Sequence, residues 1–196
     1  MFKKAALFLP LLFIGTLAHA QTADQVYDQY LDFNMARLKS ESGKAMLIGE
    51  SLLPNVAKLP AKSQITYYAG LAKVYEDSSQ PEKALTYYEM VTKAEPDYYV
   101  AHRALGYLYY EQASAVYDKM KVTNDAAALA SLTAVYKPKV LKALPHLEKA
   151  QACDPTAETL TLINFLYNSI KDKKGLDALD GKLKTLSTNC MSVLSE

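Results

Sequence analysis

Histidine and cysteine are the residues of this 196-residue chain with the most evident chemistry, because they can act as bases, nucleophiles or metal ligands. Beyond the first twenty residues the chain has two of each: His102, His146, Cys153 and Cys190. Their spacing matches no short pair of zinc ligands, so the sequence predicts no metal site. The acidic residues are scattered among lysines at helical spacing, which is typical of a solvated face.

The sequence also lacks the motifs that mark several large enzyme classes. It contains no H-E-x-x-H, no G-x-x-x-x-G-K-[ST], no G-x-G-x-x-G and no G-x-S-x-G. The formal net charge is only +1, so no basic excess indicates a nucleic-acid partner. Half of the residues are hydrophobic, which predicts one globular unit with a substantial core. We therefore expect a protein that is not an enzyme and that uses no cofactor.

Residues 1–20 have the three parts of a secretory signal peptide. Lys3 and Lys4 form a positive start, residues 5–17 are an apolar run of 13 residues, and residues 18–20 (Ala-His-Ala) form a small-x-small cleavage site. The apolar run is shorter than the about 20 residues that a membrane span needs. We expect cleavage near Ala20 and an exported chain, periplasmic or secreted, without a membrane span and with a net charge of about −1. The alternative is an N-terminal anchor that is never cut.

Export changes what the two cysteines predict. In an oxidising compartment Cys153 and Cys190 can form a disulfide, whereas in the cytosol they would normally stay reduced. The bond would close a loop of 37 residues. In the chain-entropy description, such a loop stabilises the fold by about 3 to 4 kcal/mol. The alternative is a pair of small buried thiols, because the sequence does not give the distance between them.

A pattern of aromatic, small and proline residues occurs twice between residues 65 and 155. The first copy is Tyr68-x2-Leu71-Ala72-x2-Tyr75, Ala84-x3-Tyr88 and Pro96, and the second is His102-x2-Leu105-Gly106-x2-Tyr109, Ala143-x3-Leu147 and Pro155. This order resembles the tetratricopeptide repeat, whose pattern is W-x2-L-G-x2-Y, A-x3-F and P. The resemblance implies an all-α fold, a short right-handed solenoid of antiparallel helical hairpins. It also implies a packing position for His102, and we interpret His146, among charged neighbours, as a surface residue.

The hairpins of this fold can be placed along residues 21–196. Residues 65–98 form the clear repeat, and residues 99–155 form a repeat with an insertion at about 111–137. Residues 22–60 are interpreted as a degenerate N-terminal hairpin and residues 156–196 as a C-terminal capping hairpin. Because the insertion keeps a helical rhythm on both sides of a turn at residues 123–125, it predicts an antiparallel helical arm. The arm makes this hairpin about 18 Å longer than an ordinary one.

Local signals predict where individual helices begin and break. Thr22 and Gln25 have the spacing of a capping box. The predicted N-caps are Ser63, residues 123–125 and Thr156. Pro81 suits the first turn of a helix, whereas Pro54 and Pro138 predict kinks or breaks. Leucines at three- and four-residue steps predict one last helix over residues 176–186.

The resemblance implies a concave surface lined by the first helix of each hairpin. The residues that it places on this surface are Thr66, Ala69, Lys73, Glu76, Arg103, Tyr107, Tyr110, Asn164, Tyr167 and Asn168. Tyrosine and arginine carry much of the binding energy of typical interfaces, so we expect a protein or peptide partner that docks without bond chemistry. The alternative is that the long insertion buries some of these residues.

Some tetratricopeptide repeats hold a chaperone's C-terminal carboxylate with a set of lysine, asparagine and arginine residues. With the same phasing, this chain keeps only Lys73 of that set. Alanine or threonine stands at the other places: Ala69, Ala104, Ala157 and Thr161. This activity is therefore not expected.

Two other functions remain open from the sequence. The arm could join copies of the chain, making it a structural subunit of an envelope complex. The tyrosines of the concave surface could instead bind a glycan or another small ligand. The sequence does not identify the partner, the process or the oligomeric state, since a fold does not fix a function.

Overall fold

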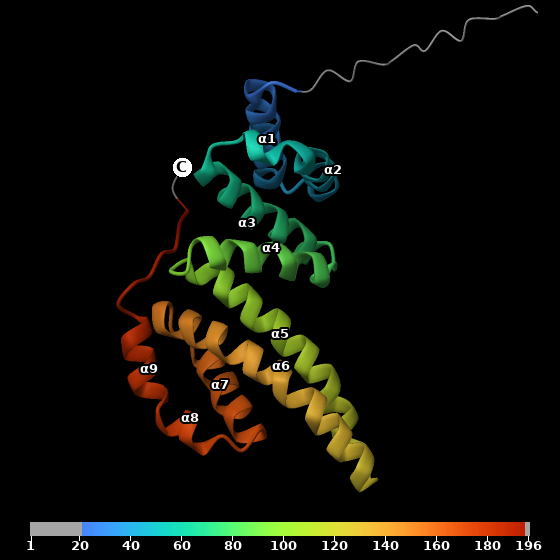
Figure 1. Ribbon diagram of the computed structural model, residues 1–196, viewed down its shortest axis with the longest axis vertical. Helices are drawn as coiled ribbons and strands as arrows, with labels where there is room; N and C mark the ends of the chain where they lie inside the picture. Colours follow the sequence, from blue (N-terminus) through green and yellow to red (C-terminus); the bar gives the residue numbers. More distant parts are fainter. Residues whose placement is uncertain (1–20, 195–196) are drawn as a thin grey trace, which may run out of the picture.

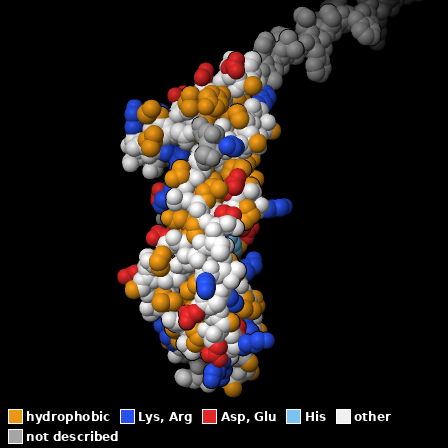
Figure 2. Space-filling view, turned by 90° about the vertical axis from the view of Figure 1, so that its left-hand side faces the viewer, with side chains coloured by type: hydrophobic (Ala, Val, Ile, Leu, Met, Phe, Trp, Pro, Cys, Tyr) orange, Lys and Arg blue, Asp and Glu red, His pale blue; other side chains and the backbone are white. Residues whose placement is uncertain are grey.

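The computed structural model of the protein describes residues 21–194, and the predicted signal peptide lies outside this range. The described residues form an all-α structure in which helices pack side by side along one long axis (Figure 1). Within residues 21–194, no helix combines the length and the apolar character needed to cross a bilayer. Figure 2 shows one long face on which hydrophobic, basic and acidic side chains are interspersed. This mixture agrees with the near-zero net charge.

The first two helices are α1 (Ala23–Leu38) and α2 (Ser42–Leu52). The predicted capping box of α1 is confirmed, because the Thr22 side chain accepts from the Gln25 amide and the Gln25 side chain accepts from the Thr22 amide. The predicted break at Pro54 is also confirmed. There α2 gives way to the 3-10 helix η1 (Leu53–Lys58), with Pro54 in its first turn.

The next pair is α3 (Ala61–Asp77) and α4 (Pro81–Ala94), and Pro81 stands in the first turn of α4 as predicted. The prediction that Ser63 caps α3 is wrong, because Ser63 is buried inside the first turn. The helix begins earlier, where the Gln64 amide donates to the Pro60 carbonyl. The small and apolar positions of the repeat pattern are in the core, including Leu71, Ala72 and Ala84. The core also holds Tyr67, whose hydroxyl donates to the Gly49 carbonyl at 2.6 Å.

The long hairpin consists of α5 (Tyr99–Lys121) and α6 (Ala126–Cys153), which pack against each other along the lower part of the molecule (Figure 1). Asp125 caps α6 by accepting from the Ala128 amide at 2.7 Å, as the predicted turn required. The helix does not restart at Pro138, because α6 is continuous to Cys153. Burial of Tyr136 and Val140 on either side offsets the hydrogen bond that the proline cannot make.

The base of the arm packs against α7 (Ala157–Ser169). The Tyr117 ring lies 5.3 Å from the Phe165 ring, edge to face, and 5.5 Å from the Tyr136 ring. The hydroxyls of Tyr136 and Ser169 form a hydrogen bond of 2.7 Å. The N-cap predicted for Thr156 is confirmed, because its hydroxyl accepts from the Thr159 amide. Only the outer part of the hairpin is therefore free of contacts with α7.

The last helical segment is divided into α8 (Lys173–Asp177) and α9 (Leu179–Leu186), so the prediction of one helix is wrong. Asp172 caps α8 through the Gly175 amide, and a Cβ on Gly175 would lie only 2.3 Å from the Tyr167 ring. This close approach fixes α8 against α7. The chain then turns so that α9 packs along α6 (Figure 1).

Residues 187–194, which we call the C-terminal strap, run back along the stack toward α3 (Figure 1). A disulfide joins Cys190 of the strap to Cys153 at the end of α6, which is one of the two alternatives that the sequence left open. The Met191 amide donates to the Asp97 carbonyl at 2.8 Å, and the Tyr99 amide donates to the Met191 carbonyl at 3.1 Å. The strap thereby ties the last hairpin to the middle of the molecule.

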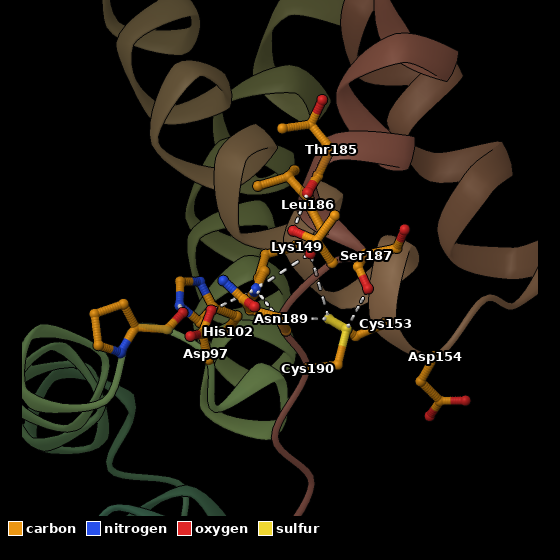
Figure 3. The surroundings of a disulfide bond; sticks show 12 residues. Asp97, His102, Lys149, Cys153, Asp154, Thr185, Leu186, Ser187, Asn189 and Cys190 are labelled. Carbon is orange, nitrogen blue, oxygen red and sulfur yellow. Dashed lines mark hydrogen bonds and ion pairs between the residues drawn. A yellow bond between two sulfur atoms is a disulfide. The ribbon is translucent and has the colours of Figure 1, made fainter.

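Lys149 of α6 binds groups from α9, from the strap and from the segment before α5 (Figure 3). Its side chain is only 7% exposed, and its ammonium group donates to Asp97 Oδ1 at 2.9 Å and to the Leu186 carbonyl at 3.3 Å. A third bond goes to the Asn189 carbonyl. An ammonium group has three protons, so all of its donors are used.

Candidate functional site

The first candidate site is a pocket of about 340 Å³ between α3 and α5, which we call the α3–α5 pocket. Its lining residues are Lys73, Glu76, Tyr88, Val100, Arg103, Ala104, Tyr107, Leu108 and Glu111. Four of the residues that the sequence placed on the concave surface meet here, Lys73 and Glu76 from α3 with Arg103 and Tyr107 from α5. The helices bring them together because these residues lie between the core positions of each helix.

The charges on the α3 side of this pocket are largely neutralised by neighbours. Lys73 Nζ lies 2.6 Å from Asp77 Oδ1 and 3.2 Å from Glu76 Oε1, and the hydrogen bond to Asp77 is the main reason why its pKa is raised. The other Glu76 oxygen accepts from the Tyr88 hydroxyl at 2.8 Å. Glu111 is exposed at the far end. The pocket therefore has a weak net field and an apolar centre formed by valine, alanine and leucine side chains.

Arg103 and Tyr107 are tied to the end of α6 and to the start of α7, respectively. Arg103 Nη2 donates to Asp154 Oδ2 at 2.8 Å and to the Asp154 carbonyl at 2.9 Å. The hydroxyls of Tyr107 and Thr159 lie 3.0 Å apart. Arg103 thus holds the end of α6, and Tyr107 the first turn of α7, against α5 while both line the pocket. Their substitution would disturb the fold as well as any binding site.

The second candidate site is a pocket of about 450 Å³ between α1 and α3, which we call the α1–α3 pocket. Its lining residues are Asn34, Arg37, Leu38, Ser40, Ser42, Ala45, Thr66, Lys73, Val74 and Asp77. Thr66 is the residue of the predicted site that appears here, and Lys73 lines both pockets. The two pockets are therefore adjacent along one side of α3.

The remaining predicted site residues line neither pocket. Tyr110 is half-buried at the base of the arm. The placement of Tyr167 is corrected, because its ring is buried and its hydroxyl bonds to Glu148 and, at 2.7 Å, to Lys182 Nζ. Asn168 donates to the Asn164 carbonyl at 2.8 Å, one turn earlier in α7. The contacts of α7 with α6 and α9 turn Tyr167 inward, and the repeat pattern does not encode those contacts.

A pair of histidines packs between α5 and α6. His102 Nδ1 lies 3.0 Å from His146 Nδ1, and the His146 ring also stacks on Tyr109. The prediction that His146 is a surface residue is wrong, because it is half-buried. Burial, followed by the charge of His102, lowers the pKa of His146 to about 4. The sequence signal that could have found this pair is the spacing of His146, three residues after the buried Ala143.

Another cluster of acidic and basic side chains joins α6 to the C-terminal helices. Glu148 Oε1 lies 3.3 Å from Lys182 Nζ, and Glu148 is buried. Among residues 21–194, no three histidine, cysteine or acidic side chains are grouped as a metal site would need.

Comparison with family models, with curated proteins and with solved structures found no match. Functional inference for this chain therefore comes from the geometry of the pockets.

Proposed function

We propose that this protein is a non-catalytic scaffold of the cell envelope that binds a protein or peptide, and that its stacked hairpins are a short solenoid of the tetratricopeptide type. The observation that carries the proposal is the adjacency of the two pockets, which share Lys73 and extend over α1, α3 and α5. A mixed polar and apolar lining to which helices α1 to α5 all contribute suits an extended polypeptide. The repeat pattern and the helix pairs support the solenoid.

The lining of the α3–α5 pocket also supports a peptide ligand. Val100, which lines the pocket with Ala104 and Leu108, is 39% exposed, so an apolar side chain can gain burial there. Glu111 and Tyr107 at the edge can form hydrogen bonds to a peptide. An apolar centre with a polar rim is the usual arrangement of a protein interface.

Export is the second part of the proposal, and the disulfide supports it. Bonds such as Cys153–Cys190 persist in oxidising compartments and are rare in the cytosol. The protein recovered from the envelope fraction should begin near Gln21 by mass spectrometry. Recovery of the chain with residues 1–20 still attached would contradict cleavage.

The peptide-binding proposal can be tested with a random peptide library selected on the chain from Gln21 onward. Fluorescence anisotropy would then compare the selected peptides on two matched variants. Val100→Glu places a charge in the apolar lining of the α3–α5 pocket, whereas Met90→Glu changes an equally exposed residue of α4, at 41%, outside both pockets. We expect at least tenfold weaker binding by Val100→Glu and no change for Met90→Glu. Selection of no peptide, or equal binding by both variants, would refute the proposal.

A second candidate function is self-association through the outer part of the long hairpin. Val122 at the end of α5 is 79% exposed, and Leu129 and Val135 on α6 are also exposed. These apolar side chains lie beyond the contacts with α7. A partner that covers them would bury apolar area, which favours association.

A further inference from the structure

Arg37, in the last turn of α1, is a half-buried cation, and the carboxylate whose charge acts on it is that of Asp77, in the same pocket. Its Nη1 donates to Asn34 Oδ1 at 3.0 Å, and its guanidinium carbon lies 5.4 Å from the centre of the Phe33 ring. Burial is the largest influence on its pKa, which is lowered. Within residues 21–194, Arg37 forms no ion pair, unlike Lys73 across the same pocket. Because an arginine stays charged in proteins, the cost of this burial is not removed by losing the proton.

The backbone of α3 is shaped to receive the Arg37 guanidinium. A Cβ on Gly70 would lie 2.4 Å from Arg37 Nη1 and 2.6 Å from Arg37 Cζ. Any larger residue at this position would push the side chain away from the helix. Glycine therefore gives the guanidinium a fixed place in the wall of the α1–α3 pocket.

Hydroxyl donors surround the same space. Ser40, Ser42 and Thr66 line the α1–α3 pocket with Arg37. The Thr66 hydroxyl donates to the Lys62 carbonyl at 3.2 Å. No hydrogen bond within residues 21–194 uses the hydroxyls of Ser40 and Ser42. A guanidinium with two free hydroxyls is a donor set that suits an anion.

The charges in the pocket distinguish between anions. Lys73 already faces two carboxylates, those of Glu76 and Asp77, so it offers little to a further anion. Arg37 contributes a single positive charge. One carboxylate can accept two parallel hydrogen bonds from a guanidinium, and it adds only one negative charge to a region where Glu76 and Asp77 already outweigh Lys73 by one. A phosphate dianion would leave a larger excess of negative charge beside Asp77, which also lines the pocket.

We propose that the α1–α3 pocket binds one carboxylate of an acidic side chain on a polypeptide ligand, with Arg37 as the main donor and Ser40 and Ser42 beside it. This inference rests on the proposed function in one respect, because the peptide ligand proposed there is what carries the carboxylate. The pocket adjoins the α3–α5 pocket at Lys73, so a peptide that fills one can place an acidic residue in the other. The ligand class is thus a peptide with an acidic residue next to an apolar one.

The test uses the ¹⁵N-labelled chain from Gln21 onward and three small probes. These are N-acetylglutamate N-methylamide, its glutamine counterpart and inorganic phosphate. We expect the glutamate probe to shift the Arg37 Nε–H signal and the amide signals of Ser40 and Ser42 in a saturable manner. Equal shifts with the glutamine probe, or tighter binding of phosphate than of glutamate, would overturn the assignment of a carboxylate.

Variants separate the role of Arg37 from general effects of charge. Arg37→Gln removes the cation, Gly70→Ala keeps it but displaces it, and Lys121→Gln removes an exposed lysine at the end of the arm. We expect at least fivefold weaker glutamate binding in the first two and no change in the third. Circular dichroism confirms that each variant is folded. Full binding by folded Arg37→Gln would overturn the proposal.

The two proposals can fail separately. Saturable glutamate binding without any selected library peptide would refute the peptide scaffold and retain the carboxylate site. Selected peptides that contain no acidic residue and bind Arg37→Gln normally would refute the carboxylate site and retain the scaffold.

Discussion

The paired rings of His102 and His146 make the stability of this protein depend on pH. Their Nδ1 atoms lie 3.0 Å apart, so one must donate and the other must accept. Burial lowers the pKa of both residues, and Tyr109 of α5 and the charges of Asp97 and Lys149 also lie around the pair. The folded protein therefore keeps the rings neutral at pH values where the unfolded chain takes up protons.

From these pKa shifts we predict that the free energy of unfolding falls as the pH falls from about 6.5 to about 4. In this range the unfolded chain binds more protons than the folded one, and below it both states are protonated. The expected loss is about 1 to 2 kcal/mol, because the pair is partly exposed. Urea unfolding at pH 7 and pH 4.5 measures it. His146→Gln should show a smaller loss than the native chain, and an equal loss would contradict the assignment to this pair.

Gly106 allows α5 and α6 to approach closely. A Cβ at this position would lie 2.7 Å from Leu147 Cδ2 and 3.0 Å from the Leu147 amide nitrogen. We predict that Gly106→Ala lowers the free energy of unfolding by about 1 to 3 kcal/mol, since both helices would have to move apart. Gly43→Ala is the control, because no atom lies within 4 Å of its Cβ position. That change should leave the free energy of unfolding unchanged or raise it by about 0.5 to 1 kcal/mol. Equal destabilisation by the two variants would show that the contact with Leu147 does not cause the loss of stability in Gly106→Ala.

Among the structural elements, the C-terminal strap shows how one covalent bond and one buried lysine hold a segment without helical structure. The Cys153–Cys190 bond fixes one point, and Lys149 bonds to the carbonyls of Leu186 and Asn189, which precede Cys190 (Figure 3). Met191 then pairs through its backbone with the segment before α5. Few apolar side chains of the strap are buried, so these bonds supply most of its attachment.

Reduction of the disulfide, or its replacement by serines, should therefore detach the strap. We predict a decrease of about 2 to 4 kcal/mol in the free energy of unfolding. The amides of Tyr99 and Met191, which bond across the strap, should lose protection from hydrogen exchange. Amides of the α3 core, such as that of Leu71, serve as the internal control. Unchanged protection at Met191 after reduction would show that the backbone pairing holds the strap by itself.

At the scale of the whole molecule, the long hairpin has an inner part that belongs to the core and an outer part that does not. Tyr117 packs on Phe165 of α7 and Tyr136 bonds to Ser169 of α7, whereas residues 118–135 are exposed or half-exposed. Replacement of residues 119–133 by a short turn should thus keep the core intact. We predict a melting temperature within a few degrees of that of the native chain.

The same shortened chain tests self-association. Gel filtration with light scattering would show an oligomer of the native chain that is absent from the shortened one, if the outer part of the hairpin joins copies. The same oligomeric state for the two chains would refute the proposal that copies associate through this segment. Binding of selected peptides should be unchanged in either case, because the replaced residues line neither pocket.

The sequence alone predicted the features that depend on neighbours in the chain. The capping box at Thr22, the cap at Thr156 and the helical course of the insertion all follow from signals within a few residues. The all-α class was implied by the resemblance of residues 65–155 to a helical repeat, and the described residues are all-α. Lys73, Arg103 and Tyr107 line one pocket, because the repeat pattern fixes which side of α3 and α5 faces the core.

Only the tertiary structure decided the features that depend on how one helix lies against another. Tyr167 turns inward because α7 packs on α6 and α9, and His146 is half-buried because the close contact at Gly106 brings its ring to His102. Arg37 gave no signal in the sequence, since its pocket exists only where α1 crosses Gly70 of α3. Spacing along a chain specifies which face of a helix is apolar, but the angles at which helices cross come from the packing of side chains distant in sequence.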